Sequence, residues 1–533
     1  MSGFSIGSLP LRLAFLASRP DFARSPPPIV NEVDRLVFGR LHALQIHPSP
    51  LCDDTTFVRR ACLDLTGELP TAEVARTFIA DLNPGKRARL IDELLERPAY
   101  AEFWAIRWSD LLRNEERTLD RKGVANLHGW IRAEIARNTP LNVFAARLLT
   151  ASGTYAEPPA NYYRAARDAE TRAEATAPVF LGVRLQYAEV SQHPFDRWTQ
   201  NGYYNWGNVF AFDYKVLENR RQDSNDKHEL SGEQIVFLND DGALKDPRSG
   251  QPREPRLLGA NDPLAGDADR LESLATWVTA PENPWFARTQ ANRIFAQLFG
   301  RGLIDPVDDL RATNPAVYPE LLDWLAAELA AHKFDQRQLI RTLMNSSLYQ
   351  LSSEPTDTNR DDDAHFARNI PRRLTAEQLL DSLIQATGAD VQFDGYPQHE
   401  RQVAGVAAVR SRSHAPSPAD RFLVRFGKPP REQSCDCERS DESTLAQTFE
   451  LVSGEMIEIC CPGPAIASII YCSRESRTRC WFPSCTGARS SRAPSARELS
   501  AAAQHLSAAK DRRQAAEDVL WSLMNSGEFL LRR

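Results

Sequence analysis

The side chains with the greatest capacity for chemistry are concentrated between residues 180 and 206, FLGVRLQYAEVSQHPFDRWTQNGYYNW. His193 precedes a proline there, and because proline removes a backbone donor and restricts its predecessor, a helix cannot continue through it. Large rings follow at Phe195, Trp198, Tyr203, Tyr204 and Trp206. The residues alone predict a rigid, aromatic-lined site around His193 on a loop.

A second group that could do chemistry consists of the carboxylates Asp305, Asp308 and Asp309. Carboxylates this close together can coordinate Ca²⁺ or perform acid–base catalysis. Arginines lie near them in the sequence, so an ion-paired loop is the favoured interpretation. Asp308 and Asp309 therefore stay weak candidates for a metal site.

The cysteines are unevenly distributed, since five of the nine lie between Cys460 and Cys485. Cys435 and Cys437 are separated by one residue, and two thiols so placed could contribute to a metal site. A second pair, which makes zinc motifs specific, does not follow them. A local disulfide or two reduced thiols is the simpler interpretation.

Motifs of common enzyme classes are absent from the sequence, which contains no HExxH, no glycine-rich phosphate loop and no GxSxG. His128 lies on a predicted amphipathic helix, where a structural role is favoured over a role as a ligand. The sequence therefore does not predict nucleotide-dependent or serine-hydrolase chemistry.

Length and composition favour a folded protein of more than one domain. The chain has 533 residues, 42% hydrophobic and 25% charged, which exceeds one ordinary core. A net charge of −7 gives no general attraction to nucleic acid or anionic membranes. No apolar run approaches the roughly 20 residues needed to span a bilayer. Leu9 to Ala17 resembles a short signal core, but Arg12 interrupts it.

Apolar residues recur at helical spacing on both sides of a short central β region. Residues 57–65 predict a helix with Arg59 and Arg60 on its polar side, ended by Thr66-Gly67. Residues 234–238 predict a strand, 239–242 a turn, and Ala243-Leu244 a return strand. Farther on, Asp335 can cap one helix, and Thr375 with Gln378 forms a capping-box pair for another. The predicted fold class is mainly α, with two helical domains joined by a small β-hairpin insert.

The predicted parts follow from these patterns. They are a leader or linker at 1–29 with a possible degenerate signal, an N-terminal helical domain at 30–213, a β-hairpin and proline-rich linker at 214–265, a C-terminal helical domain at 266–455, an aberrant disordered segment at 456–491, and closing helices at 492–533.

The stretch at 181–200, LGVRLQYAEVSQHPFDRWTQ, closely resembles the signature of a paired-domain family, DUF 1549 followed by DUF 1553, known as planctomycete-type cytochrome-like proteins. Two further strings resemble the second family domain: NPWFARTQANRIFAQLFGRGLIDPVDDLRATNP and RRLTAEQLLDSLIQATG. The matching strings occur in the family's order and cover roughly residues 30 to 455. The resemblance implies DUF 1549-like and DUF 1553-like domains at 30–213 and 266–455.

Family members read LGVRLQCAxCHNHPFDRWTQ at this signature, and its CxxCH is the attachment pattern of haem c. This chain has Tyr187 and Val190 at the two thiol positions and Ser191 at the axial-histidine position. His193 is a possible residual ligand, and the flanking residues Phe195, Asp196, Arg197 and Trp198 match the family. The expected cofactor is therefore none, although the resemblance implies haem c in relatives.

Two functions are compatible with the absence of the CxxCH residues. The favoured one is an uncharacterised, non-catalytic binding or scaffold protein that has lost covalent haem attachment. The alternative is an exported haem-c redox or electron-transfer protein whose CxxCH is obscured by a sequence error. The resemblance also implies a periplasmic or extracellular location, with redox or cell-envelope proteins as possible partners; substrate, reaction and oligomeric state stay open.

The segment from 457 to 491, IEICCPGPAIASIIYCSRESRTRCWFPSCTGARSS, departs from the family pattern, which resumes at RAPSARELS. It is rich in cysteine, lacks helical periodicity and stands where relatives have ordinary helices. A compensated frameshift is the favoured explanation over a disulfide knot. After it, residues 499–529 are expected to form two closing helices.

Overall fold

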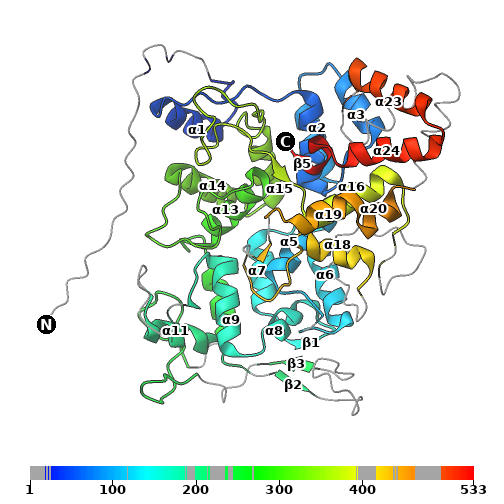
Figure 1. The fold of residues 1–533 in the computed structure, drawn as a ribbon. Coiled ribbons are helices and arrows are strands. Elements are labelled where there is room, and N and C mark those ends of the chain that lie inside the picture. The colour runs from blue at the N-terminus through cyan, green and yellow to red at the C-terminus, as the bar shows by residue number, and fades with distance from the viewer. Residues whose placement is uncertain are drawn as a thin grey trace, which may run out of the picture.

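The computed structural model (Figure 1) describes most of the chain. The described residues are 26–116, 118–186, 188, 198–212, 214–216, 234–237, 244–266, 269–391, 393, 416–435, 438–439, 442–462, 492 and 494–533, together with Arg19 and Phe22. Within them the protein is mainly helical, as the sequence predicts. No helix in these ranges is long and apolar enough to cross a membrane.

The N-terminal half is built from short helices. They are α1 (Glu32–Ala43), α2 (Asp54–Thr66), α3 (Ala72–Ala80), α4 (Lys86–Leu95), α5 (Pro98–Leu111), α6 (Arg121–Ala136), α7 (Leu141–Leu149), α8 (Asn161–Ala165), α9 (Ala169–Thr176) and α11 (Gln200–Gly207), with the helical turns η1 (Pro158–Ala160), η2 (Ala177–Leu181) and η3 (Asn208–Phe210).

The C-terminal half is also built from short helices. Its helices are α12 (Arg270–Thr279), α13 (Phe286–Phe299), α14 (Pro319–Ala331), α15 (Gln336–Asn345), α16 (Ala376–Thr387), α18 (Pro418–Arg425), α19 (Leu445–Ser453), α20 (Glu455–Cys460), α23 (Ala496–Ala508), α24 (Arg512–Met524) and α25 (Gly527–Leu530).

Local chemistry explains where several helices begin and end. The Asp335 side chain accepts from the Gln338 amide at the start of α15, and Thr375 forms a capping box with Gln378 at the start of α16. Gly67 adopts a left-handed conformation (φ 73°) after α2, where a side chain would be strained. All three boundaries agree with the sequence prediction.

The prediction that Arg59 and Arg60 lie on a polar face of α2 is wrong. Both are buried, at 6% and 0% exposure, because α2 is surrounded by other elements. Arg59 donates to the Phe529 carbonyl (2.7 Å), and Arg60 donates to the Tyr349 carbonyl (2.6 Å). Their hydrogen bonds connect α2 to residues far away in the sequence. Helical periodicity alone cannot predict such contacts.

The small sheet differs from the predicted hairpin in its pairing. Strand β3 (Gln234–Val236) lies between β1 (Gly153–Thr154) and β2 (Tyr214–Val216), antiparallel to both. The predicted return strand does not form at Leu244, which lies in no strand, while residue 243 is outside the described residues. A separate pair joins β4 (Arg372–Arg373) to β5 (Leu531–Arg532).

Two clusters of buried residues make up the core. The larger cluster contains Val33 of α1, Phe180 of η2 and Leu321 of α14, so it extends across both halves of the chain. The smaller cluster is built mainly from α16, α18, α20, α23 and α24, and Leu63 of α2 also belongs to it. Burial of shared apolar surface therefore connects the two predicted domains.

The boundary between the predicted domains can be tested by limited proteolysis. Most residues in 246–262 are exposed, and exposed loops are the preferred cleavage sites. We expect the first cuts there, with the two fragments staying associated because they share the larger core cluster. Protection of 246–262 together with early cuts inside 30–210 would contradict the division.

The segment predicted to be aberrant begins with an ordered helix. Residues Met456, Ile457 and Cys460 lie in α20 and are buried in the smaller core cluster, so disorder is not found for these positions. The stretch 463–491 lies outside the described residues. Beyond it, α23 and α24 are the two closing helices expected from the sequence.

Candidate functional site: an arginine-rich cavity

The aromatic loop predicted from the sequence is described only at its two ends. The positions Tyr187, Val190, Ser191, His193, Phe195, Asp196 and Arg197 lie outside the described residues. At the N-terminal end, the Gly182 carbonyl accepts from the Leu310 amide (2.8 Å), and Arg184 pairs with Asp308 (2.5 Å). At the other end, Trp198 is 7% exposed and its ring lies 6.3 Å from that of Trp285.

Three of the predicted loop rings belong to a helix instead. Tyr203, Tyr204 and Trp206 lie on α11 and are 1%, 9% and 0% exposed. The Trp206 indole donates to the Ala173 carbonyl (3.1 Å), and the Tyr203 hydroxyl donates to Glu174 (2.8 Å). Core packing therefore explains these rings, which do not line an open site.

The carboxylate cluster after α13 forms ion pairs. Asp308 pairs with Arg184, Asp309 lies 3.3 Å from Arg311, and Asp305 lies 3.5 Å from Arg301. Among the described residues, no group of three or more His, Cys, Asp or Glu side chains is arranged to hold a metal ion. The arrangement matches the ion-paired loop favoured from the sequence.

The cysteine pair has a different outcome at each position. Cys435 is disulfide-bonded, whereas Cys437 lies outside the described residues. The other described cysteines carry free thiols, and burial raises the pKa of Cys62 and Cys460 to about 12. Thiols that stay protonated are poor metal ligands and nucleophiles.

His128 has a structural environment. The Ser109 hydroxyl lies 3.2 Å from His128 Nδ1, and a Glu102 oxygen lies 3.9 Å from Nε2. This order imitates a catalytic triad, but Ser109 and His128 are both completely buried. The small cavity at Glu102, of about 20 Å³, is lined by neither Ser109 nor His128.

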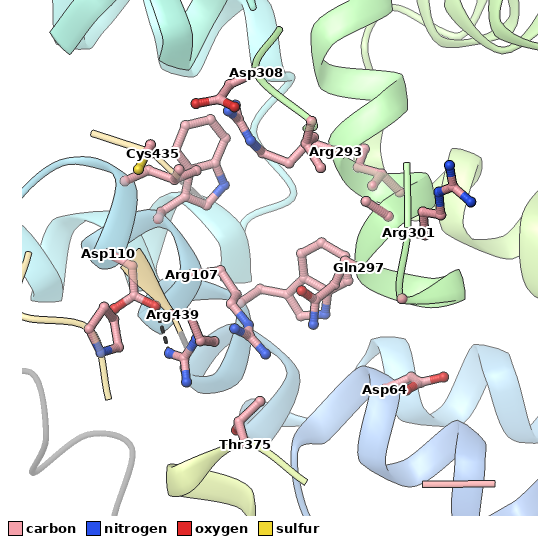
Figure 2. A pocket seen from close by; sticks show the side chains of 18 of the residues that line it. Asp64, Arg107, Asp110, Arg293, Gln297, Arg301, Asp308, Thr375, Cys435 and Arg439 are labelled. Atoms are coloured by element: carbon pink, nitrogen blue, oxygen red, sulfur yellow. Dashed lines mark hydrogen bonds and ion pairs between the residues drawn. The ribbon is translucent and has the colours of Figure 1, made fainter. Parts of the chain in front are cut away.

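The feature best suited to hold a ligand is a cavity of about 370 Å³ between α5 and α13 (Figure 2). Arginines and aspartates line much of it: Arg107, Arg293, Arg301, Arg372, Arg373, Arg439, Arg532, Asp64, Asp110, Asp305 and Asp308. Further lining residues are neutral. They comprise the apolar Trp104, Trp108, Leu111, Leu141, Ile294, Ala296, Pro306, Val307 and Pro429, the polar Gln290, Gln297, Gln336, Thr375 and Gln378, and Gly300 and Cys435. We call this space the arginine-rich cavity.

Helical spacing brings the lining residues to one face of each helix. Trp104, Trp108 and Leu111 recur at intervals of four and three residues on α5. Gln290, Ile294 and Gln297 do the same on α13. Among the described residues, no group forms a hydrogen bond with the Gln297 side-chain amide, which lines the cavity. This amide is therefore available to a ligand.

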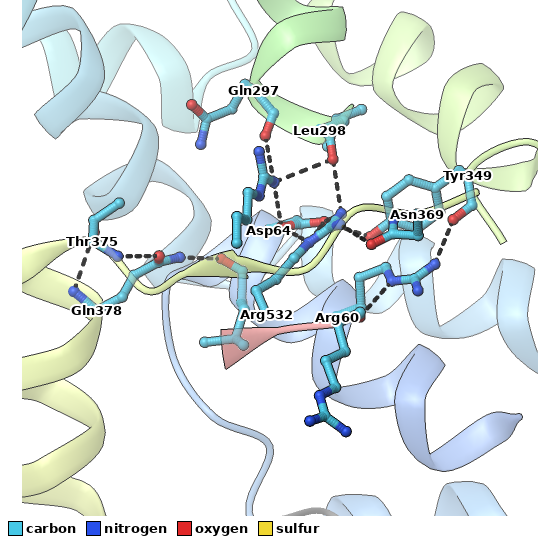
Figure 3. A network of polar contacts seen from close by, with 12 residues as sticks. Arg60, Asp64, Gln297, Leu298, Tyr349, Asn369, Thr375, Gln378 and Arg532 are labelled. Carbon is cyan, nitrogen blue, oxygen red and sulfur yellow. Dashed lines mark hydrogen bonds and ion pairs between the residues drawn. The ribbon is translucent and has the colours of Figure 1, made fainter. Parts of the chain in front are cut away.

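At the floor of the cavity, Asp64 is the acceptor in a network of polar contacts (Figure 3). Asp64 accepts from Arg532 Nε (3.0 Å) and from Arg372 Nη2 (3.2 Å), and it also accepts from the Tyr349 hydroxyl (2.8 Å). Arg60 lies on the ring of Tyr349, 5.8 Å from its centroid. Arg60 does not line the cavity; it donates to the carbonyls of Tyr349 and Leu351 and to a main-chain oxygen of the last residue, Arg533. Within the cavity, one buried carboxylate is therefore shared by two guanidinium groups, those of Arg372 and Arg532.

The ionisation of the floor follows from burial and charge. Burial opposes ionisation of Asp64, but Arg532 and Arg372 outweigh it and hold the pKa of this carboxyl below its usual value. Burial, helped by the nearby charge of Arg532, lowers the pKa of Arg372 to about 10. All three groups are charged near neutral pH. Arg372 keeps 30% of its side-chain surface exposed, so its charge is accessible to a ligand.

A second set of ion pairs includes two further residues that line the cavity, Asp110 and Arg439. Asp110 of α5 accepts from Arg439 (2.8 Å) and from Arg431 (2.9 Å), and Glu377 of α16 accepts from Arg439 (2.7 Å). Burial would raise the pKa of Glu377, but the Arg439 charge outweighs it and lowers that pKa. These bonds hold Arg431 and Arg439 against α5.

Comparison with known families explains why two segments meet at this cavity. A family model described as PSCyt2, protein of unknown function (DUF1549), matches residues 32–213, and one described as PSD1, protein of unknown function (DUF1553), matches residues 269–506. The chain belongs to the paired DUF1549–DUF1553 family. Neither a curated protein nor a solved structure matches it. In this DUF1549–DUF1553 protein, α5 and α13 come from different family segments, so the cavity lies where they meet.

The residues of the DUF1549 signature do not fit covalent haem. Thioether attachment needs a sulfur at each of two positions, and Tyr187 and Val190 have none. Ser191 at the axial position is a poor iron ligand. These three side chains therefore lack the groups that thioether attachment and axial ligation use.

Sequence reasoning missed the cavity because its residues are distributed over several helices and loops. One signal was present: Arg107 interrupts the apolar stripe of α5, and Gln290 and Gln297 interrupt that of α13. Polar side chains on a predicted buried face must find partners, so each such position marks an interior polar site. The meeting of both faces with Arg372 and Arg532 depends on tertiary structure.

Proposed function

We propose that this protein is a non-catalytic binding protein that takes a small anionic ligand in the arginine-rich cavity, and that it carries no covalent haem. The observation that carries the proposal is the floor of the cavity, where two lining arginines, Arg372 and Arg532, share the single carboxylate of Asp64. Buried positive charge in excess of its counter-charge is costly, and a bound anion compensates it.

Geometry supports direct contact between the ligand and the floor. Arg372 and Arg373 both line the cavity, and the hydrogen bonds of Arg373 go to the neutral Gln447 side chain and the Glu442 carbonyl (2.9 Å). Guanidinium groups bind carboxylate and phosphate oxygens through paired hydrogen bonds. The volume of about 370 Å³ lies in the range of small-molecule sites.

Charge reversal at Gln297 tests the proposal. Gln297→Glu preserves the size of the side chain and places a carboxylate beside Arg372, where it competes with the ligand. We expect at least a tenfold weaker affinity for citrate by titration calorimetry at constant ionic strength, equivalent to about 1.4 kcal/mol. The affinity for inorganic phosphate should also be lower in this variant.

The matched control is Gln504→Glu, which adds the same charge on the exposed surface of α23. Its affinity for citrate should equal that of the unmodified protein. Equal weakening in both variants would assign the effect to net charge. Failure of the unmodified protein to bind citrate or phosphate would contradict the proposed function.

We also propose that the protein works outside the cytoplasm, in the periplasm or extracellularly. The disulfide at Cys435 supports this location, because disulfides persist in oxidising compartments and are rare in reducing ones. Redox or cell-envelope proteins stay the expected class of partner for an exported member of this family.

A further inference from the structure

The arginine-rich cavity has an apolar wall in addition to its charged floor. Trp104, Trp108 and Leu111 of α5 form one part of this wall, and Ile294 of α13 belongs to it as well. A site for a fully hydrated inorganic ion would need no such wall. The lining therefore indicates a ligand that has an apolar part.

The wall and the floor lie at neighbouring levels along α13. Arg372 of the floor donates to the carbonyls of Gln297 (2.9 Å) and Leu298 (3.2 Å), near the C-terminal end of the helix. Ile294 precedes Gln297 by three residues, or about 4.5 Å along the helix axis. One small molecule can therefore contact both with two different ends.

The aromatic part of the wall is held in place before any ligand binds. The ring of Trp108 lies 4.8 Å from that of Phe144, and the ring of Trp104 lies 5.8 Å from that of Tyr100. Both tryptophans are almost fully buried, at 4% and 6% exposure for Trp104 and Trp108. Prearranged side chains reduce the entropy cost of binding.

We infer that the ligand of the arginine-rich cavity is an aromatic or alicyclic carboxylate, with its acid group on Arg372 and Arg373 and its ring against Trp108 and Ile294. The inference rests on the proposed function that this cavity binds anions. A dry cavity of about 150 Å³ accommodates benzene. The 370 Å³ of this cavity therefore suffices for a two-ring acid.

Three probes separate the contributions of charge and ring. They are 2-naphthoate, which has both features, 2-naphthalenemethanol, which has the ring without the charge, and citrate, which has charge without a ring. We expect 2-naphthoate to bind the full-length protein at least tenfold more tightly than either other probe, by titration calorimetry or quenching of tryptophan fluorescence.

Two variants assign each feature to its residues. Ile294→Thr makes the wall more polar. It should weaken the affinity for 2-naphthoate about fivefold and leave the affinity for citrate unchanged. Gln297→Glu should weaken both acids and leave the alcohol unchanged. Ile384→Thr is the matched control, since Ile384 packs against the smaller core cluster and does not line the cavity.

The outcomes distinguish the two proposals. If citrate binds as tightly as 2-naphthoate, and Ile294→Thr does not weaken the binding of 2-naphthoate more than that of citrate, the proposed ligand class is wrong. The proposal that the cavity binds anions is then unaffected. If neither acid binds, the proposed function fails along with the ligand class. If the alcohol binds as tightly as 2-naphthoate, the carboxylate contact with the floor is wrong. Ile294→Thr could instead act by destabilising the fold, which a melting temperature well below that of Ile384→Thr would reveal. In that case the milder variant Ile294→Val, which keeps the fold, should still weaken the binding of 2-naphthoate selectively. If Ile294→Val binds 2-naphthoate as tightly as the unmodified protein, the contact between the ring and the wall is wrong.

Discussion

Replacing Asp64 with asparagine is expected to lower the free energy of unfolding by about 3–5 kcal/mol, the usual cost of removing one partner from a buried ion pair. Asp64 is 3% exposed, and its carboxylate accepts from Arg532, Arg372 and Tyr349. Without it, these guanidinium groups and Arg60 repel one another in a buried environment. Denaturant unfolding monitored by circular dichroism measures the change.

The exposed Asp361 provides the matched control, because Asp361→Asn removes the same charge from the surface and should change stability little. The double variant Asp64→Asn with Arg532→Gln should be less destabilised than the sum of its single variants. Additive effects would contradict the coupling between Asp64 and Arg532. The Asp64 contribution is fully present at neutral pH and is lost only as the pH falls through its lowered pKa.

Expression of this sequence in a host that exports proteins and matures cytochrome c is expected to give no covalent haem. Tyr187, Val190 and Ser191 supply neither the two sulfurs nor the axial imidazole of a CxxCH site. A haem stain and an absorption spectrum of the denatured protein measure covalent attachment directly. A Soret band that survives denaturation would contradict the prediction.

Restoring the motif is expected to reverse the result. The triple variant Tyr187→Cys, Val190→Cys, Ser191→His should acquire covalent haem, because both ends of the loop are anchored in the fold, at Gly182 and at Trp198. The control Tyr187→Ser, Val190→Ser, Ser191→His has the same axial histidine but no sulfurs, and it should stay free of covalent haem. Haem in both variants, or in neither, would contradict the thioether explanation.

Local sequence signals were sufficient for much of the fold. Capping side chains such as Asp335 and Thr375, and the glycine at position 67, marked helix boundaries correctly. These signals depend on hydrogen bonds between residues close in sequence, so they survive without tertiary information. The mainly helical class follows from them and from apolar periodicity.

Tertiary contacts decided the features that the sequence did not predict. Arg60 was placed on a polar face, yet it hydrogen-bonds to carbonyls almost three hundred positions away, with a sequence separation of 289 to Tyr349. Tyr203 and Trp206 were assigned to a functional loop, whereas they complete the core on α11. Strand β3 pairs with Gly153 and Thr154 of β1, a partner far upstream.

The candidate site also combines features that the local sequence predicts with features that depend on tertiary contacts. Asp305 and Asp309 pair with Arg301 and Arg311 on the same stretch, as expected for an ion-paired loop, whereas Asp308 pairs with the distant Arg184, a contact that the local sequence does not indicate. The floor of the cavity combines Asp64 of α2, Arg372 of β4 and Arg532 of β5, separated by 308 and 468 positions from Asp64. No local pattern connects these three residues, so only the folded structure brings the anion site together.

The most direct measurement is anomalous diffraction from crystals of the full-length protein soaked in selenate, whose selenium locates a bound anion. The account predicts a selenium peak inside the arginine-rich cavity, with selenate oxygens about 2.7–2.9 Å from the guanidinium nitrogens of Arg372 or Arg373. Crystals of Gln297→Glu should lack this peak. Selenium peaks confined to the outer surface, with the cavity empty in the unmodified protein, would contradict anion binding at this site.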